Sequence, residues 1–405
     1  MNGAPRPDRL ICTACAREAA IATVPSTCPV CDGILELLIG EQPQPMGEGL
    51  WRWHDHLPLV APAHRVSLGE AGTPLLPAPR LGRELGLADL WIKNESLQPT
   101  GSFKDRALAL ATSLAVEYGR LGVVLSSSGN AGAAAAAYAA RAGLRAIVLV
   151  PAAAVPAKLK QIRITGAQLV TIDGATHDCC RLASRAADAL GFVNVTTTFY
   201  CPYGVDAYAT IAYELAAIEP DIVLLPVSSG PILAGVMKGF QRLFDQGRIG
   251  RLPRPVAIQS AACRPIVEAF DKAMPAVAPP PRPTVAAALN DTLEGYERDG
   301  DYTVAILRRY SGTAIAVEDN EILEAVRRIA RLEGIAVEPS AAAPVAALPH
   351  LLARGSVAPG ERIVAVVTGH ALKDMPEQVL PALAEPIAPT LDALQRRLRL
   401  AANLG

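Results

Sequence analysis

The sequence predicts an α/β protein with doubly wound, mainly parallel sheets. Short apolar runs rich in β-branched residues alternate with longer amphipathic or alanine-rich stretches from residue 68 onward. Examples of the apolar runs are 145–150, 168–172, 256–259 and 362–367. Apolar strands that alternate with helices are typical of parallel sheets with right-handed crossovers. The chain has 405 residues, which is long for a single core, so we expect more than one domain.

The composition limits the classes of function. Hydrophobic residues make up 51% of the chain, and 38 lysines and arginines nearly balance 39 acidic residues. The chain can therefore bury a large core, and nucleic-acid binding through bulk charge is not expected. The sequence has no apolar stretch of membrane-spanning length and no basic-then-apolar pattern at its N-terminus. We therefore expect a cytoplasmic protein.

Four of the eight cysteines form two Cys-x2-Cys pairs near the N-terminus. Cys12 pairs with Cys15, and Cys28 pairs with Cys31. Two such pairs can present four sulfur atoms tetrahedrally to zinc, and in a cytosolic chain a metal site is favoured over disulfides. We therefore expect a zinc-ribbon-like segment over residues 1–40. Two disulfides, or a site that has lost its metal, are the alternatives.

The segment Pro99–Arg106 places one lysine at the start of a predicted helix, directly after a strand-like run at 90–93. Ser102 is the predicted N-cap, and Asp105 stands where the acid of a capping box would lie. Lys104 would then lie near the positive end of the helix, which favours its neutral amine. A neutral lysine amine is the nucleophile that attacks an aldehyde. A single lysine near a helix start is otherwise an ordinary surface residue, so the neighbouring motifs decide between the two interpretations.

Two further glycine-containing loops lie between an apolar run and a helical run. The first loop is 126–130, between 123–125 and 131–140, and the second is 228–231, between 221–227 and 232–237. A turn that opens a helix can bind an anion through its backbone N–H groups and the helix dipole. Most isolated turns of this kind only reverse the chain, so each loop taken alone is a weak signal.

The sequence PTGSFKDR at 99–106, preceded by Lys93-Asn94-Glu95, closely resembles the cofactor-lysine motif of the threonine synthase family. These are pyridoxal-phosphate enzymes of fold type II, similar to the tryptophan synthase β-subunit. The resemblance continues in family order through nearly the whole chain: the cysteine pairs, the AGTPL motif at 71–75, the three loops, a segment at 334–342 and TGHALKD at 368–374. It implies two doubly wound domains with the cofactor between them. The large domain would comprise 41–104 and 210–405, and the small domain 105–209.

The resemblance also implies roles for individual residues. Lys104 would form the Schiff base with pyridoxal phosphate and act as the general base. The implied cofactor contacts are Lys104, Asn130, Val227, Ser228, Ser229, Gly230, Pro231 and Thr368. The implied substrate contacts are Thr100, Ser127, Ser128 and Gly129, and the implied zinc ligands are Cys12, Cys15, Cys28 and Cys31. The chemistry agrees, because an asparagine amide and a helix N-terminus serve the phenolic oxygen and a carboxylate without adding a competing charge.

The family reaction converts O-phosphohomoserine and water to threonine and phosphate. The resemblance therefore implies a pyridoxal-phosphate-dependent lyase of amino-acid biosynthesis that acts on a small amino acid as a homodimer, with neither nucleic acid nor membrane as partner. The sequence departs from the family pattern in two regions that would contact ligands. Gly204 and Ala209 stand where the family commonly has arginine and lysine in its substrate-phosphate region. The serine-rich turn 228–231 replaces a pattern of glycine and asparagine, and Pro231 removes one N–H donor.

Three hypotheses about function follow. The first is a threonine synthase proper. The second is a divergent pyridoxal-phosphate enzyme that performs β- or γ-elimination or replacement on a different amino acid, which the loss of the two basic residues favours. The third is a non-catalytic protein that uses the cysteine-rich segment to bind a partner. The presence of Lys104, Asn130 and Thr368 together argues against the third hypothesis.

Overall fold

The computed structural model of the chain describes residues 7–40, 44–154, 159–383 and 385–402, with the backbone alone for 399–402. The chain forms two compact units, Met1–Met375 and Pro376–Gly405. The first unit contains the sheets, and the described part of the second contains a short 3-10 helix (Glu377–Val379) and the helix α12 (Leu391–Ala402). None of the helices described is of a length and hydropathy that would allow it to cross a membrane.

The largest sheet of the first unit has six strands in the order β12-β11-β10-β13-β5-β4. The strands are β4 (Leu75–Pro77), β5 (Asp89–Asn94), β10 (Ile222–Pro226), β11 (Arg254–Ser260), β12 (Thr313–Val317) and β13 (Arg362–Val367). All neighbours pair in parallel except β4 and β5, which are antiparallel. The sheet is therefore mixed, with one antiparallel pair in an otherwise parallel sheet. The exception is a short edge strand that ends in Pro77, and an edge is where a sheet tolerates proline.

The second sheet has four parallel strands in the order β8-β7-β6-β9. The strands are β6 (Gly122–Ser126), β7 (Arg145–Pro151), β8 (Gln168–Ile172) and β9 (Val193–Asn194). The strands β6 and β7 are largely buried and rich in valine, leucine and isoleucine, as expected for strands covered by helices.

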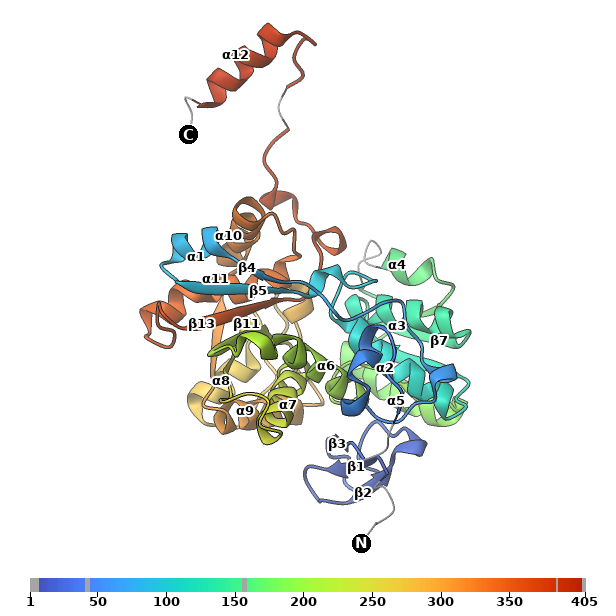
Figure 1. The fold of residues 1–405 in the computed structure, drawn as a ribbon. Coiled ribbons are helices and arrows are strands. Elements are labelled where there is room, and N and C mark those ends of the chain that lie inside the picture. Colours follow the sequence, from blue (N-terminus) through green and yellow to red (C-terminus); the bar gives the residue numbers. More distant parts are fainter. Residues whose placement is uncertain (1–6, 41–43, 155–158, 384, 403–405) are drawn as a thin grey trace. The chain divides into compact units, whose positions relative to one another are not determined.

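Helices cover both sheets (Figure 1). In chain order they are α1 (Pro79–Leu85), α2 (Lys104–Glu117), α3 (Asn130–Ala142), α4 (Lys160–Arg163), α5 (Thr176–Leu190), α6 (Pro202–Leu215), α7 (Pro231–Asp245), α8 (Pro265–Lys272), α9 (Arg298–Arg309), α10 (Asp319–Arg328) and α11 (Pro339–Ala353). Helix α11 packs on β10 to β13 and helix α8 on β11 and β12, and they lie on opposite faces of the larger sheet. Helices α3 and α5 pack on β6 and β7.

The N-terminal segment forms a third, small sheet. Its antiparallel strands, in the order β2-β1-β3, are β1 (Arg9–Cys12), β2 (Glu18–Ala20) and β3 (Leu35–Leu38). Strand β3 packs against α6, so this sheet lies on the body of the first unit. Leu10 and Leu37 are fully buried in the contact and join the main hydrophobic core.

The predicted loops follow the carboxyl ends of strands. Residues 127–129 follow β6, 227–230 follow β10, and Thr368 follows β13. In open α/β sheets, ligands bind at the carboxyl ends of the strands. This topology places the candidate functional loops where a ligand site is expected.

Candidate active site

A cavity of about 690 Å³ lies at the carboxyl ends of strands from both large sheets. Its wall contains ten of the residues singled out from the sequence: Lys104, Ser127, Ser128, Gly129, Asn130, Ser228, Ser229, Gly230, Pro231 and Thr368. Two others lie behind the wall. Val227 is fully buried and donates its N–H to the Ile258 carbonyl at 2.8 Å. Thr100 donates both its N–H and its hydroxyl to Asp105, at 3.0 Å each.

Lys104 is the first residue of α2 and faces this cavity. Its Nζ donates a long hydrogen bond to the Thr197 carbonyl at 3.4 Å and lies 4.6 Å from the centre of the Phe103 ring. Burial lowers the pKa of Lys104 to about 8, whereas the Asp291 carboxyl opposes this shift. The sequence predicted a lowered pKa from the helix terminus, but the main cause is desolvation of the charged form. About a tenth of this lysine is therefore neutral at pH 7, far more than for a lysine with an ordinary pKa.

The turn before Lys104 is closed differently from the predicted capping box. Phe103 is the N-cap, without a side-chain cap, and the Ser102 hydroxyl is buried without a partner among the described residues. Asp105 instead accepts hydrogen bonds from Thr100, and burial raises the pKa of Asp105 to about 7. The predicted cap was wrong because backbone contacts already hold the turn. Ser102 forms a β-bridge with Gly369, and the Phe103 N–H donates to the Thr368 carbonyl at 3.0 Å.

The turn at 228–231 opens α7, a helix of 15 residues. Gly230 is its N-cap with a φ of 117°, and a Cβ at this position would collide with the Thr303 side chain. Only glycine therefore fits here. The Ser229 hydroxyl is buried and has no hydrogen-bond partner among the described residues. An unpaired hydroxyl beside the positive end of a long helix fits the phosphate of pyridoxal phosphate.

Asn130 is the first residue of α3 on the opposite side of the cavity, and its Nδ2 donates to Glu338 Oε1 at 2.8 Å. A Cβ on Gly369 would collide with the Glu338 carboxylate, so the Thr368–Gly369 turn approaches Glu338 as closely as glycine allows. In the sequence, Glu338 is indicated only through the resemblance of the segment 334–342. Its contact with Asn130 joins positions 208 residues apart and could not be read from local patterns.

One wall residue that the sequence analysis did not identify is Asp291. It lies in the segment between α8 and α9, where no motif marks it. Its Oδ1 accepts hydrogen bonds from the Tyr296 hydroxyl at 2.6 Å and the Leu293 N–H at 3.1 Å. Burial raises its pKa, and the nearby Lys104 opposes this shift. The Asp291 carboxyl group therefore influences the pKa of Lys104, and the family resemblance did not indicate it.

A group of buried charges, which we call the ionic floor, lies beneath the lysine turn. It consists of Lys93 and Glu95 at the end of β5, Arg106 in α2 and Glu214 in α6. Arg106 donates two hydrogen bonds to Glu95, at 2.8 Å each, and two to Glu214, at 2.9 and 2.8 Å. Lys93 Nζ lies 2.5 Å from Glu214 Oε2. Although burial opposes ionisation, Arg106 holds the pKa of Glu214 at about 2.

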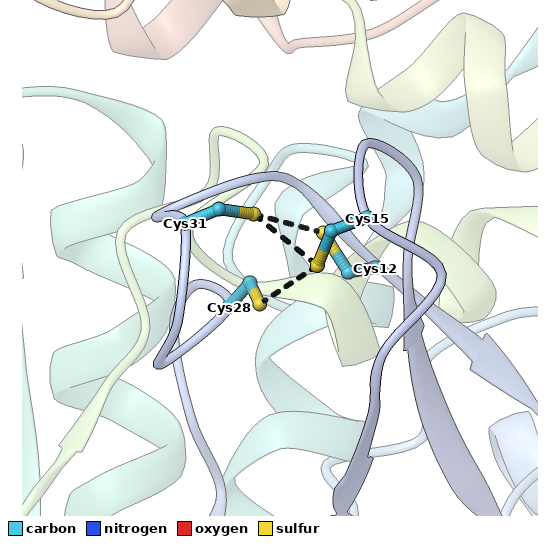
Figure 2. A group of neighbouring side chains, drawn as sticks. All are labelled: Cys12, Cys15, Cys28 and Cys31. Atoms are coloured by element: carbon cyan, nitrogen blue, oxygen red, sulfur yellow. Dashed lines mark hydrogen bonds between the residues drawn. The ribbon is translucent and has the colours of Figure 1, made fainter.

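The four N-terminal cysteines form a cluster at one end of the small sheet (Figure 2). Their sulfur atoms all lie within 4.8 Å of one another, with close pairs at 3.4 to 3.7 Å. A tetrahedral zinc site with Zn–S bonds of about 2.3 Å needs sulfur atoms roughly 3.8 Å apart. Backbone N–H groups of Val30 and Cys31 lower the pKa of Cys28 to about 6, which favours the thiolate that binds metal. The donor set therefore fits zinc.

A half-buried lysine with a lowered pKa, facing a helix-opening serine turn across one cavity, is an arrangement that suits an enzyme with an aldehyde- and phosphate-bearing cofactor. The chain belongs to the pyridoxal-phosphate dependent enzyme family, whose model matches residues 66–369. Its curated relatives include threonine synthases. The threonine synthase of Methanocaldococcus jannaschii is 35% identical over 93% of this chain and 95% of the relative. That of Mycobacterium tuberculosis is 34% identical over 85% of this chain and 95% of the relative.

Solved structures share the fold. Threonine deaminase isoform 2 of Solanum lycopersicum has a TM-score of 0.65 at 20% identity, over 89% of this chain and 91% of that chain. Maize serine racemase has a TM-score of 0.64 at 23% identity, over 82% and 92%. These likenesses establish the α/β fold of fold-type II pyridoxal-phosphate enzymes, with mixed sheets. The resemblance to threonine synthases drawn from the motifs is thereby confirmed, and the chain is a pyridoxal-phosphate-dependent lyase that resembles threonine synthase.

Proposed function

We propose that the protein converts O-phosphohomoserine and water to threonine and phosphate, with Lys104 as the catalytic residue. The observation that carries this proposal is the position of Lys104, half-buried with a lowered pKa in a large cavity, in a chain with threonine synthases among its relatives. A neutral lysine amine can bond to the cofactor and can accept a proton from the substrate.

The residues around the cavity have distinct parts in this proposal. Lys104 holds the cofactor, the turn at 228–231 takes its phosphate, Asn130 its phenolic oxygen and Thr368 its ring nitrogen. When bound, pyridoxal phosphate withdraws electrons from the substrate Cα and so acidifies the Cα proton. The turn at 127–129 opens α3, so its N–H groups and hydroxyls suit the substrate carboxylate. Lys104 would accept the Cα proton once the substrate's amino group has displaced it from the cofactor, because its lowered pKa of about 8 leaves part of the free amine unprotonated.

The proposal extends to the organisation of the chain. Residues 105–209, which carry the four-stranded sheet, would form the small domain, and 41–104 with 210–405 the large one. The cofactor would lie between them. The four cysteines would hold a structural zinc ion, supported by the distances between their sulfur atoms. The resemblance to the family supports a homodimer.

A second candidate function is elimination or replacement on a different, unphosphorylated amino acid. It is favoured by the shortage of available positively charged side chains in the cavity wall. Gly204 packs against α2, where a Cβ would lie 3.0 Å from that of Ala107, so position 204 has no room for a cation. No arginine lines the cavity among the residues that the structure describes. Lys373 of the wall already donates to the Thr100 carbonyl and Gln161 Oε1, at 2.8 and 2.6 Å. A phosphate group would therefore depend on Lys160, the third lysine of this wall.

Product analysis by mass spectrometry distinguishes the two candidates. The cofactor-loaded protein is incubated with O-phosphohomoserine and, separately, with serine, threonine and homoserine. Threonine and free phosphate that form with the native chain but not with Lys104→Ala support the first candidate. Turnover of an unphosphorylated amino acid alone supports the second. A native chain that shows no visible absorbance band with pyridoxal phosphate, or none that Lys104→Ala removes, contradicts both.

If O-phosphohomoserine is the substrate, Lys160→Ala should raise KM about tenfold, because a charge-assisted bond to phosphate is lost. Arg163→Ala, in the same short helix but not in the wall, is the matched control and should leave KM unchanged. An unchanged KM in Lys160→Ala would remove this lysine as the phosphate ligand.

A further inference from the structure

Two segments of the cavity wall, each with one residue beside Lys104, meet next to the start of α9. One is 196–198, which follows β9, and the other is 287–296, which precedes α9. The residues at which they meet are Phe199, Tyr200, Tyr296, Arg298 and Asp299, and we call this group the wall junction. Tyr296 is itself a wall residue, and the other four lie within three residues of one in the sequence, so a shift of the junction would move both segments.

Contacts within the wall junction hold the two segments together. The rings of Tyr200 and Tyr296 meet edge to face with centroids 6.3 Å apart, and the Arg298 guanidinium lies 5.5 Å from the Tyr200 centroid. The Phe199 N–H donates to Asp299 Oδ2 at 3.3 Å. On the cavity side, the Tyr296 hydroxyl donates a hydrogen bond to the Asp291 carboxylate at 2.6 Å. A shift of the first turn of α9 would therefore displace Tyr296 and, through it, the Asp291 carboxyl group that faces Lys104.

The cysteine cluster contacts the same junction through Arg298. The guanidinium Nη1 donates to the Asp32 carbonyl oxygen and to Asp32 Oδ2, the latter at 2.8 Å. Asp32 directly follows Cys31, and its N–H donates to the Cys28 carbonyl at 2.9 Å, so it belongs to the turn that presents these two thiols. The φ of Asp32 is 57°, a left-handed conformation that aspartate adopts as a single residue in a turn.

The rest of the small sheet has apolar and polar contacts of its own with the body. The Tyr302 hydroxyl, one turn further along α9, donates to Glu36, and its ring packs edge to face on Phe199 with centroids 5.1 Å apart. Lys238 Nζ of α7 donates to the Leu37 carbonyl at 2.6 Å. These contacts hold β3, whereas Arg298 donates hydrogen bonds to the cysteine turn itself.

We propose that a metal ion in the four-cysteine cluster positions the active-site wall through Arg298, which makes Arg298 a positioning residue for the cavity. A bound metal fixes the turn at both of its cysteine ligands, and metal binding and local folding are coupled in such sites. With the turn fixed, the Asp32 oxygens hold the guanidinium on Tyr200, and the wall junction is ordered. The proposal rests on the proposed metal site and is independent of which amino acid is the substrate.

Hydrogen exchange followed by mass spectrometry tests the proposal on the full, cofactor-loaded chain, with zinc bound and after removal of zinc by a chelator. We expect zinc removal to accelerate exchange not only in 8–40 but also in 196–201 and 287–299, by about threefold or more. Arg298→Ala, with zinc bound, should accelerate exchange in 196–201 and 287–299 alone. In this variant, zinc removal should produce no further change there.

Two variants sharpen the result. Arg298→Lys retains one cationic donor and should restore part of the response to zinc. Arg9→Ala removes an exposed ion pair with Glu18 inside the small sheet and should retain the full response. If zinc removal unfolds the whole chain, Asp32→Ala with zinc bound replaces it and should reproduce part of the effect of Arg298→Ala, because the bond to the Asp32 carbonyl oxygen remains.

Three results would overturn the proposal: a chain that binds no stoichiometric zinc, a response confined to 8–40, or a response in 287–299 that persists in Arg298→Ala. Because exchange is measured without turnover, these results are separate from any failure of the proposed reaction.

Discussion

The ionic floor and the cavity wall differ in how completely their buried polar groups are hydrogen-bonded. In the floor, each carboxylate oxygen of Glu95 and Glu214 accepts a hydrogen bond from Arg106, and Lys93 donates to the Thr73 carbonyl as well as to Glu214. In the wall, the Ser229 hydroxyl has no partner among the described residues. Buried polar groups are normally paired, so unpaired ones call for an explanation. The floor satisfies itself and acts as scaffold, whereas the Ser229 hydroxyl of the wall is available to a ligand.

The largest effect is expected from breaking the floor. Arg106→Ala leaves Glu95 and Glu214 buried without their shared cation, and we expect the free energy of unfolding to fall by about 3–5 kcal/mol. Chemical denaturation with loaded enzyme measures this change. Arg181→Ala, which removes an exposed pair with Asp178 in α5, is the control and should cost less than about 1 kcal/mol. Equal effects of the two substitutions would refute the distinction between floor and surface.

An intermediate effect concerns the pH dependence of cofactor attachment. Only the neutral amine of Lys104 reacts, and its pKa is about 8. The rate at which cofactor-free protein combines with pyridoxal phosphate should therefore fall about tenfold per pH unit below that pKa and level off above it. Stopped-flow absorbance from pH 6 to 10 measures the profile. An ordinary lysine, with a pKa of 10.5, would show a rate that still rises at pH 9 to 10.

The Asp291 carboxyl raises the pKa of Lys104. Asp291→Asn should consequently move the plateau of the same profile to lower pH. A plateau at unchanged pH would mean that Asp291 exerts no field on the lysine, and the wall would then have one fewer functional group than we infer.

The smallest effect is expected at the unpaired hydroxyl of the wall. Ser229→Ala removes one hydrogen bond to the cofactor phosphate, and we expect the dissociation constant of pyridoxal phosphate to rise about tenfold. Equilibrium dialysis against the cofactor measures it. The matched control is Thr112→Val in α2, because Thr112 also has a buried hydroxyl without a partner but lies outside the cavity wall. A similar loss in both variants would attribute the effect to folding rather than to the site.

Much of the fold could be predicted because strands and helices leave local periodic patterns. The predicted runs 168–172 and 362–367 are β8 and β13 residue for residue, and the alanine-rich run at 131–140 lies within α3. The antiparallel pairing of β4 could not be predicted, since strand direction depends on the partner and not on the strand itself. The cap at Ser102 failed for a similar reason, because tertiary contacts of the turn with residues 368–369 replaced the local one.

The site was predictable where a short motif carries its own turn chemistry. The loops around Lys104, Asn130 and Gly230 lie in the cavity wall, as expected from glycine-bearing turns that open helices. Asp291 and the ionic floor were not predicted. Arg106 and Glu214 are 108 residues apart, and nothing near an arginine in sequence tells which distant carboxylate it will meet. Long-range pairs of charges require the fold before they can be recognised.

The ionic floor also has a consequence for the order of assembly. Its four charges come from β5, α2 and α6, so the set is incomplete until α6 docks against α2. A partly assembled chain without α6 would leave Lys93 and Arg106 sharing Glu95 alone, which places an excess positive charge in an apolar environment. Such a state is disfavoured relative to both the folded and the unfolded chain. The floor thus couples the strand before the lysine turn to a helix encoded more than 100 residues later, so that the turn and the α6 side of the molecule should form and melt in one cooperative step.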